Sequence, residues 1–291
     1  MNKYIIIGAT GLIGRKLTKE LLDKGNEVIA LGRDKSKLDQ IFENRVKSLV
    51  YEEFYDSKQD YSDYVAINLA YARKSDFESV KDSIDFTYDI TKKLEELNIK
   101  KYVYISSQSV YKEDRKTKAC EDDLYYPTNL YGIGKVYLEN WLEKFFKNSN
   151  SDLIILRLAS IVGEGFEKRI TARMTKSAIE DHKITVNDAG QVFSFVDIDE
   201  IVWEIIAISQ LNNNRYQVYN LGSYESYSLT DIAMEISSQL SNKGIEVQVD
   251  KIKAGDYKNN SVDISRFIDE TGYEIKYDLK NIIKREIERA Y

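Results

Sequence analysis

The sequence has very little cysteine, proline or histidine: Cys120, Pro127 and His182 are the only residues of their kinds among 291. One cysteine excludes an intrachain disulfide and a cysteine metal site, and one histidine leaves a zinc cage without its usual ligands. We therefore expect no metal site. A chain without disulfides fits a reducing compartment, so the cytoplasm is the expected location.

Long apolar runs and an excess of positive charge are also missing. No run approaches the ~20 apolar residues of a membrane span, and the run that precedes Gly8 is too short for a signal-peptide core. Lys and Arg number 42 against 48 Asp and Glu, a net charge of −6. Nucleic acids and anionic membranes attract basic faces, so neither is an expected partner. With 43% hydrophobic residues, the chain can bury one large core or two modest ones.

What the sequence does contain is a glycine-rich turn directly after the apolar run Tyr4 to Ile7. It reads Gly-Ala-Thr-Gly-Leu-Ile-Gly over residues 8–14. A buried strand that breaks into three spaced glycines and then an amphipathic run is typical of a pyrophosphate site at a helix N-terminus. An ordinary strand-to-helix turn is the alternative. The expected dinucleotide contacts are Gly8, Thr10, Gly11, Leu12, Ile13 and Gly14.

The rest of the first half alternates between strand-like and helix-like patterns. Helical spacing over Arg15 to Lys24 and an apolar run over Glu27 to Leu31 complete a βαβ unit. This alternation predicts an α/β fold with a doubly wound parallel sheet of the Rossmann type. Further strands are expected at 64–70, 101–106 and 152–158, and helices at 77–97 and 131–147.

The rhythm changes after Leu158. Glycines cluster there, followed by a helical stretch at 170–180 and short strands at 184–186 and 193–196. We therefore predict a dinucleotide-binding domain over residues 1–158. Residues 159–291 are expected to form mainly a smaller, mixed α/β substrate-binding part, with segments near 191–222 returning to the first domain.

The end of the second strand bears on the choice of cofactor. The run ends in Gly32-Arg33, where an acidic residue would accept the ribose 2′-hydroxyl of NAD. A guanidinium at this point favours the 2′-phosphate of NADP. Arg33 therefore makes NADP the preferred prediction and NAD the alternative. A solvated basic turn with no role in cofactor binding is the other interpretation of Arg33.

Tyr131 and Lys135 are four residues apart, so on a helix both face the same way. A cation near a tyrosine favours the phenolate and lowers the phenol pKa, which suits acid/base chemistry on an alcohol or carbonyl. The spacing alone is weak, since Tyr88 and Lys92 share it. Only Tyr131 lies downstream of a strand that ends in hydroxyl residues, Ser106 and Ser107.

At this point the chain resembles the extended short-chain dehydrogenase/reductase family of nucleotide-sugar epimerases, dehydratases and ketoreductases. The resemblance covers essentially the whole chain. The segments that carry it are 8–14, Asn-Leu-Ala at 68–70, Ile-Ser-Ser-Gln-Ser-Val-Tyr at 105–111, 127–135, Leu-Arg-Leu-Ala-Ser-Ile-Val-Gly at 156–163, 195–200, Tyr-Asn-Leu-Gly at 219–222 and 262–265.

The resemblance implies a role for particular residues. Tyr131 would be the acid/base, Lys135 would lower its pKa and bind the cofactor ribose, and Ser107 would hydrogen-bond the reacting oxygen, with Ser106 as the neighbouring candidate. Further cofactor contacts would come from Leu69, Ala70, Arg73 and Leu158, besides Arg33, Tyr131 and Lys135. Substrate contacts would come from Ser107, Gln108, Ser160, Ser194 and Lys253.

Departures from the family pattern narrow the expected activity. Gln108-Ser109 stand where dehydratases carry an Asp-Glu pair, so 4,6-dehydration is not expected. Ser194 and Lys253 stand where the family often has arginines that meet a substrate phosphate, which leaves diphosphate recognition open. We predict ketoreduction of a nucleotide-activated sugar, with an epimerase holding NAD as the alternative. A non-catalytic dinucleotide-binding protein is the rival from another class, and a homodimer through helices 77–97 and 131–147 is the expected assembly.

Overall fold

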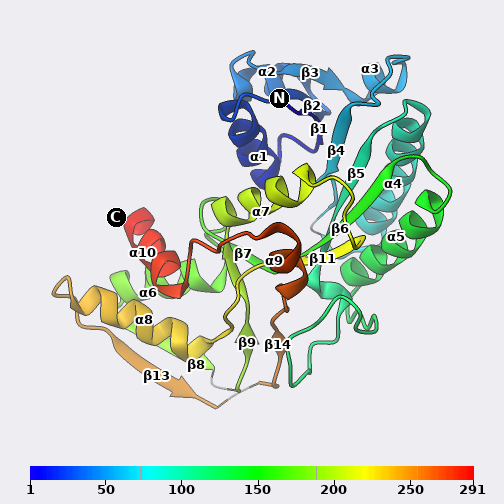
Figure 1. Cartoon of the computed structure of the whole chain (residues 1–291). Coiled ribbons are helices and arrows are strands. Elements are labelled where there is room, and N and C mark those ends of the chain that lie inside the picture. The colour runs from blue at the N-terminus through cyan, green and yellow to red at the C-terminus, as the bar shows by residue number, and fades with distance from the viewer. Residues whose placement is uncertain (73, 188, 254) are drawn as a thin grey trace. The chain divides into compact units, whose positions relative to one another are not determined.

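The computed structural model describes residues 1–72, 74–187, 189–253 and 255–291, which form two compact units (Figure 1). The first unit comprises Met1–Tyr111, Leu124–Arg157 and Val202–Tyr219. The second comprises Lys112–Asp123, Leu158–Ile201 and Asn220–Tyr291. Residues 112–123 therefore pack with the second unit although they lie inside the first half of the chain. None of the helices in this described part is long and apolar enough to cross a membrane.

A seven-stranded sheet organises the first unit, in the order β11-β6-β5-β4-β1-β2-β3. β1 pairs in parallel with β2 and β4, and so do β2 with β3 and β4 with β5. This confirms the predicted doubly wound parallel fold. The strands are β1 (Lys3–Ile7), β2 (Glu27–Gly32), β3 (Lys47–Val50), β4 (Tyr64–Asn68), β5 (Lys101–Ser107), β6 (Asp152–Leu158) and β11 (Val218–Leu221).

Helices follow most of these strands. α4 and α5 pack against one another and cover one sheet face, where Ile90, Leu138 and Leu142 join strand residues such as Ile5 and Tyr102 in a hydrophobic core. α1 packs on β1 and β2. The helices are α1 (Leu12–Asp23), α2 (Lys35–Phe42), α3 (Tyr51–Tyr55), α4 (Phe77–Glu96), α5 (Leu130–Phe146) and α7 (Ile198–Gln210), with the short 3-10 helix η1 (Gln108–Val110).

Two expected boundaries in this unit are wrong by two residues or more. α1 begins at Leu12 rather than Arg15, because the last three residues of the glycine-rich segment, Leu12 to Gly14, already form the first turn of the helix. β4 ends at Asn68 rather than Ala70, because the Asn68 side chain accepts a hydrogen bond from Ala70 N at 3.0 Å and turns the chain out of the sheet. The elements α2, β3 and α3 were not predicted from the sequence.

The second unit has three small sheets, β7 with β10, β12-β9-β14, and β13 with β8. Its core lies between α6, α8 and α10 and includes Met174, Ile236 and Ile283. The elements are β7 (Ser160–Val162), α6 (Ile170–Glu180), β8 (Lys183–Asn187), β9 (Val192–Phe193), β10 (Phe195–Asp197), β12 (Tyr227–Ser228), α8 (Leu229–Ser241), β13 (Gln248–Ile252), β14 (Asn259–Asn260), α9 (Ser265–Thr271) and α10 (Leu279–Ala290).

The single strand expected at 193–196 is two strands. β9 pairs with β12 and β14, whereas β10 pairs with β7. Ser194 between them is fully buried, and its hydroxyl accepts a hydrogen bond from Val262 N at 3.4 Å. The chain thus changes sheets at this residue, which an alternation of apolar residues along the sequence does not reveal.

Candidate active site

The glycine turn leaves β1 with a backbone that only glycine adopts easily. Gly8 has φ +84°, and its N–H donates to Leu31 O at 3.2 Å, while Gly11 N donates to Gly8 O at 3.0 Å. α1 begins one residue later with Gly11 as its N-cap. No side chain of the described chain caps this helix end and no acidic residue lies in its first turn. Backbone N–H groups at such an end suit an anion.

Close backbone contacts leave no room for a side chain at position 14 and little at position 8. A Cβ at Gly14 would collide with the carbonyl of Gly8, and a Cβ at Gly8 would lie 3.1 Å from Ala70 N. Leu69 N also donates to Ile7 O at 3.0 Å. The predicted contacts of the turn and of Leu69 and Ala70 therefore meet at the carboxyl ends of β1 and β4. In doubly wound folds, the crevice at the carboxyl ends of the strands is where ligands bind.

Arg33 follows β2 at the same edge of the sheet. It is exposed and forms no ion pair with a described residue, whereas the neighbouring Lys35 pairs with Glu53 at 2.9 Å. Tyr51 lies beside Arg33, because Val50 and Gly32 are partners in the β2–β3 ladder. Burial raises the pKa of Tyr51 to about 12, against the opposing effect of Arg33 and of the Gly8 backbone. The sequence did not point to Tyr51, since no strand was expected before it.

Tyr131 and Lys135 both lie on α5, which Asn129 caps by accepting from Gly132 N at 2.8 Å. The Lys135 ammonium is fully buried and donates to Tyr104 OH at 3.1 Å and to Ile105 O at 2.7 Å. It lies 5.8 Å from the centre of the Tyr131 ring. Burial lowers the pKa of Lys135 to about 7, although the charge of Glu139 opposes the change. The group therefore titrates near neutral pH.

The two serines at the end of β5 have different surroundings. Ser106 is buried and donates to the Glu139 carboxylate. Ser107 is half-buried and its hydroxyl accepts from Ser109 N at 3.1 Å. α5 comes very close to this turn, because a Cβ at Gly132 would collide with Ser109 O. Ser107 is therefore the serine whose hydroxyl is not committed to the buried carboxylate.

Glu139 also forms a buried ion pair that the sequence reasoning missed. Arg157 from β6 donates to Glu139 Oε2 through Nε at 3.0 Å and through NH2 at 2.7 Å. Tyr125 OH adds a hydrogen bond to the same carboxylate at 3.0 Å, and Arg157 NH1 donates to Tyr111 OH at 2.8 Å. Both charges are thus fully supplied with partners. A charged residue inside the apolar run 153–158 was the signal that a buried partner exists.

The remaining predicted contacts are spread along the chain. Gln108 begins η1, Leu158 ends β6 and Ser160 begins β7. Lys253 is exposed directly after β13, and Arg73 lies outside the described residues. The catalytic assignment and these contacts stay predictions. Among the described residues, no group of three or more His, Cys, Asp or Glu side chains could hold a metal ion.

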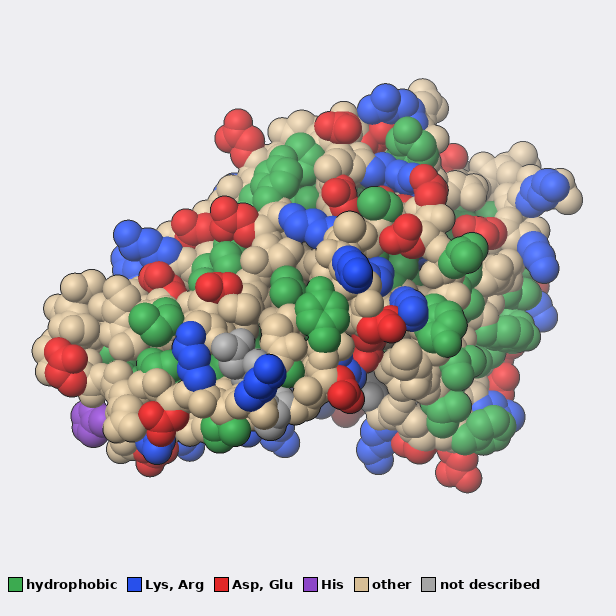
Figure 2. Space-filling view, turned by 90° about the horizontal axis from the view of Figure 1, so that it is seen from below, with side chains coloured by type: hydrophobic (Ala, Val, Ile, Leu, Met, Phe, Trp, Pro, Cys, Tyr) green, Lys and Arg blue, Asp and Glu red, His purple; other side chains and the backbone are tan. Residues whose placement is uncertain are grey.

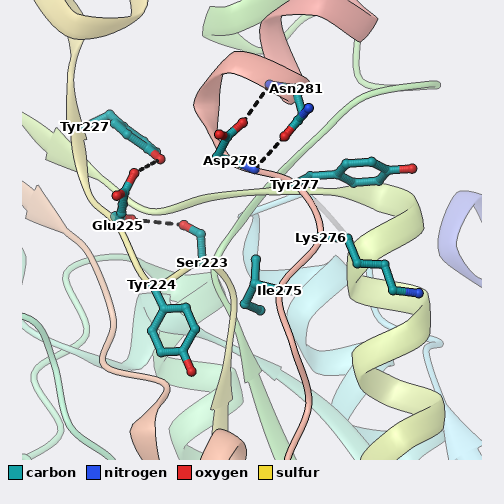
Figure 3. A pocket seen from close by; sticks show the side chains of 9 residues that line it. All are labelled: Ser223, Tyr224, Glu225, Tyr227, Ile275, Lys276, Tyr277, Asp278 and Asn281. Carbon is teal, nitrogen blue, oxygen red and sulfur yellow. Dashed lines mark hydrogen bonds between the residues drawn. The ribbon is translucent and has the colours of Figure 1, made fainter.

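A pocket of about 250 Å³ lies in the second unit, and none of the predicted site residues lines it (Figure 3). Ser223 donates to Glu225 O at 3.0 Å, and Tyr227 OH donates to the Glu225 carboxylate at 2.5 Å. The segment before α10 lines the pocket, and Glu200 holds this segment by accepting hydrogen bonds from Lys276 N and Tyr277 N. Several polar groups of the pocket wall are thus bonded to one another.

The parallel sheet, the uncapped helix after the glycine turn and the buried lysine on α5 define a dinucleotide-binding enzyme fold. Residues 4–222 match the model of the NAD dependent epimerase/dehydratase family. The chain belongs to this family, and so to the enzymes of the extended short-chain dehydrogenase/reductase type. This confirms the resemblance seen in the sequence.

Relatives extend over nearly the whole chain at low identity. UDP-glucose 4-epimerase of Lactobacillus helveticus is 23% identical over 311 residues, covering 95% of this chain and 93% of the relative. dTDP-4-dehydro-6-deoxyglucose reductase of Escherichia coli is 24% identical over 267 residues and covers 84% of each. A solved mutant of the UDP-glucuronic acid 4-epimerase of Bacillus cereus, in complex with UDP-4-deoxy-4-fluoro-glucuronic acid and NAD, matches with a TM-score of 0.81 and 21% identity, covering 99% of this chain and 98% of that one.

Proposed function

We propose that this enzyme moves a hydride between a nicotinamide cofactor and a carbon of a nucleotide-activated sugar, reducing a ketone to an alcohol. The observation that carries the proposal is the pairing of Tyr131 with a buried Lys135 whose pKa is lowered to about 7. A buried ammonium without a bonded carboxylate is costly, and perturbed groups of this kind occur at functional sites. Tyr131 lies one helical turn from this lysine, with the Lys135 ammonium 5.8 Å from the centre of its ring.

In this proposal each residue has one task. Tyr131 gives the substrate oxygen its proton on reduction and takes it back on oxidation. Lys135 supports the phenolate and binds the cofactor ribose, and Ser107 donates a hydrogen bond to the same substrate oxygen. Ser106 does not share this task, because its hydroxyl is bonded to Glu139. The nicotinamide, when bound, supplies or accepts the hydride.

The cofactor we propose is NADP, with NAD as the alternative. The support is Arg33, which is exposed at the carboxyl end of β2 where a carboxylate would select the ribose of NAD. The family description names NAD, and the relatives include epimerases, which need no net supply of reductant. The reductase relative is consistent with net ketoreduction.

Product analysis separates the two reactions. The purified protein is incubated with NADPH or NADH and a panel of nucleotide sugars and 4-keto nucleotide sugars, and both cofactor absorbance and sugar products are followed. Loss of reduced cofactor in step with alcohol formation supports ketoreduction. Conversion of one sugar epimer into the other with no change in cofactor supports the epimerase. Cofactor binding without turnover of any candidate would favour the non-catalytic alternative.

We also propose a homodimer through α4 and α5. Tyr88 OH bonds Tyr137 OH at 2.5 Å, and the rings of Tyr88 and Trp141 meet at 4.2 Å on this face. Tyr137 and Ile133 are each about half exposed, at 51% and 50%. Hydrophobic side chains gather on the side of the molecule where α4 and α5 lie (Figure 2). Sedimentation at micromolar concentration should give the mass of two chains, and the mass of one chain would contradict the proposal.

The proposed location is the cytoplasm. Cys120 is free and exposed, and it is the only cysteine of the chain. An exposed unpaired thiol suits a reducing compartment. Fractionation of the source cells would test this.

A further inference from the structure

Tyr71 is a third phenol beside Tyr131 and Lys135, and none of the predictions used it. It follows β4, and its ring centre lies 3.8 Å from the Lys135 ammonium nitrogen. It also meets the Tyr131 ring edge to face at 5.3 Å. Its hydroxyl is buried and has no hydrogen-bond partner among the described residues. Burying this hydroxyl without a hydrogen bond costs free energy, so other contacts of the Tyr71 ring must offset that cost.

α5 has a glycine at the point where this hydroxyl meets it. A Cβ at Gly134 would collide with Tyr71 OH and would lie 2.7 Å from Val80 Cγ1. Glycine in the middle of a helix costs about 1 kcal/mol relative to alanine, so its presence calls for a packing reason. The packing reason here is the Tyr71 hydroxyl, which occupies the space that a side chain at position 134 would need.

The groups that face the Lys135 ammonium come from three elements. β5 supplies Tyr104 OH and Ile105 O, which accept two of its hydrogen bonds, and the segment after β4 supplies the Tyr71 ring. Tyr131 and Glu139 lie one turn before and after it on α5 itself. Glu139 acts only through its charge, because its carboxylate is bonded to Arg157 and Ser106.

We propose that Tyr71 is a positioning residue for the Tyr131–Lys135 pair: its ring caps the buried ammonium, supports the Tyr131 ring from the side, and depends on the space left by Gly134. Aromatic rings attract cations through their faces, more strongly where water is excluded. The ring therefore favours the protonated lysine in a place where burial disfavours it. The catalytic meaning of this contact rests on the proposed function, but the contact itself does not.

The test measures the lysine directly in the cofactor-free protein. Lysine residues are labelled with ¹³C, the Lys135 Cε resonance is assigned by its loss in Lys135→Met, and its pKa is taken from a pH titration. Tyr71→Leu removes the ring face and should lower the pKa of Lys135 by about one unit. Tyr71→Phe keeps the ring and should leave it unchanged. An unchanged or raised value in Tyr71→Leu would overturn the proposal.

A second route avoids removing the tyrosine, in case Tyr71→Leu does not fold. Gly134→Ala should push the Tyr71 ring off the ammonium and lower the Lys135 pKa. Adding Tyr71→Phe should reverse part of this drop in the Lys135 pKa, because it removes the hydroxyl that collides with the new methyl group. The contact of that methyl group with Val80 is present in both variants, so it cannot explain a difference between them. If Gly134→Ala lowers the Lys135 pKa and the double variant does not raise it again, the position of the Tyr71 ring does not control that pKa.

Tyr55→Leu is the matched control. Tyr55 is half-buried and packs against the same hydrophobic core, so its loss should lower stability without moving the Lys135 pKa. On any substrate that is turned over, the pH profile of Tyr71→Leu should shift with the lysine. If no nucleotide sugar is turned over, the proposed function fails while the titration still decides the role of Tyr71.

Discussion

Lys135 and Arg157 are both buried cations of the first unit, each only 2% exposed, and they are held in opposite ways. Arg157 is bonded to the Glu139 carboxylate and to two tyrosine hydroxyls. Among the described residues, Lys135 is bonded only to neutral oxygens and lies against ring faces. Glu139 links the two environments, because it forms hydrogen bonds with Arg157 and acts on Lys135 through its charge alone.

The difference separates a structural cation from one that is free to titrate. A buried guanidinium with a bidentate carboxylate stays charged at every pH that a protein survives. A buried ammonium without such a partner changes charge near neutral pH, as a proton-handling site requires. Breaking each environment should therefore have a different consequence, and the following experiments are ordered by the size of the effect.

The largest effect is expected from Arg157→Met. The change leaves the buried Glu139 carboxylate without its cation, which typically costs 3–5 kcal/mol. Urea unfolding measures the loss of stability. The double variant Arg157→Met/Glu139→Gln should recover much of it, because no uncompensated charge is left. A double variant as unstable as the single one would contradict the structural role of the pair.

Lys135 should make stability depend on pH in the alkaline range. Its pKa is about 7 in the folded protein and 10.5 ordinarily, so between these values the unfolded chain binds a proton that the folded one does not. The free energy of unfolding should therefore rise with pH across this window, and below it Lys135 should add no pH dependence. Lys135→Met should remove that rise. Equal pH slopes for the two proteins between pH 7 and 10 would count against a buried, titrating lysine.

Tyr131→Phe should lower turnover by about 10²-fold or more and leave cofactor binding nearly intact, since it removes a proton donor but not a ring. Ser107→Ala should slow turnover less. Tyr88→Phe is the control: Tyr88 has the same spacing to Lys92, but its hydroxyl bonds Tyr137 on the outer face of the helices. Full activity of Tyr131→Phe on an accepted substrate would falsify the assignment of the acid/base.

The smallest effect concerns the cofactor. NADPH should bind at least about ten-fold more tightly than NADH, or about 1.4 kcal/mol, and Arg33→Ala should remove most of the gap. Fluorescence titration of both cofactors measures it. Lys35→Ala is the matched control, because Lys35 is already paired with Glu53. Equal affinities in the unchanged protein would exclude a role for Arg33 in selecting the phosphate.

Local patterns predicted the parts of the site that are close in sequence. The glycine turn, the helical pair Tyr131 and Lys135, and the two serines after β5 all depend on spacings of a few residues. The hydrogen bond between Ser106 and Glu139 could not be predicted, because Glu139 lies on another element. Tyr51 and Tyr71 were missed for a similar reason. Their neighbours Arg33, Gly8, Lys135 and Gly134 reach them only through strand pairing or helix packing.

The sequence by itself determined the parallel α/β fold and the family, since alternating periodicities and glycine spacing are properties of short segments. Tertiary structure decided which charges are buried, which serine is bonded to a buried carboxylate and how the run at 193–196 divides between two sheets. These outcomes depend on contacts between residues far apart in the chain. The free energy of a buried charge depends on the groups that surround it in space, and the order of residues along the chain does not show which groups those are.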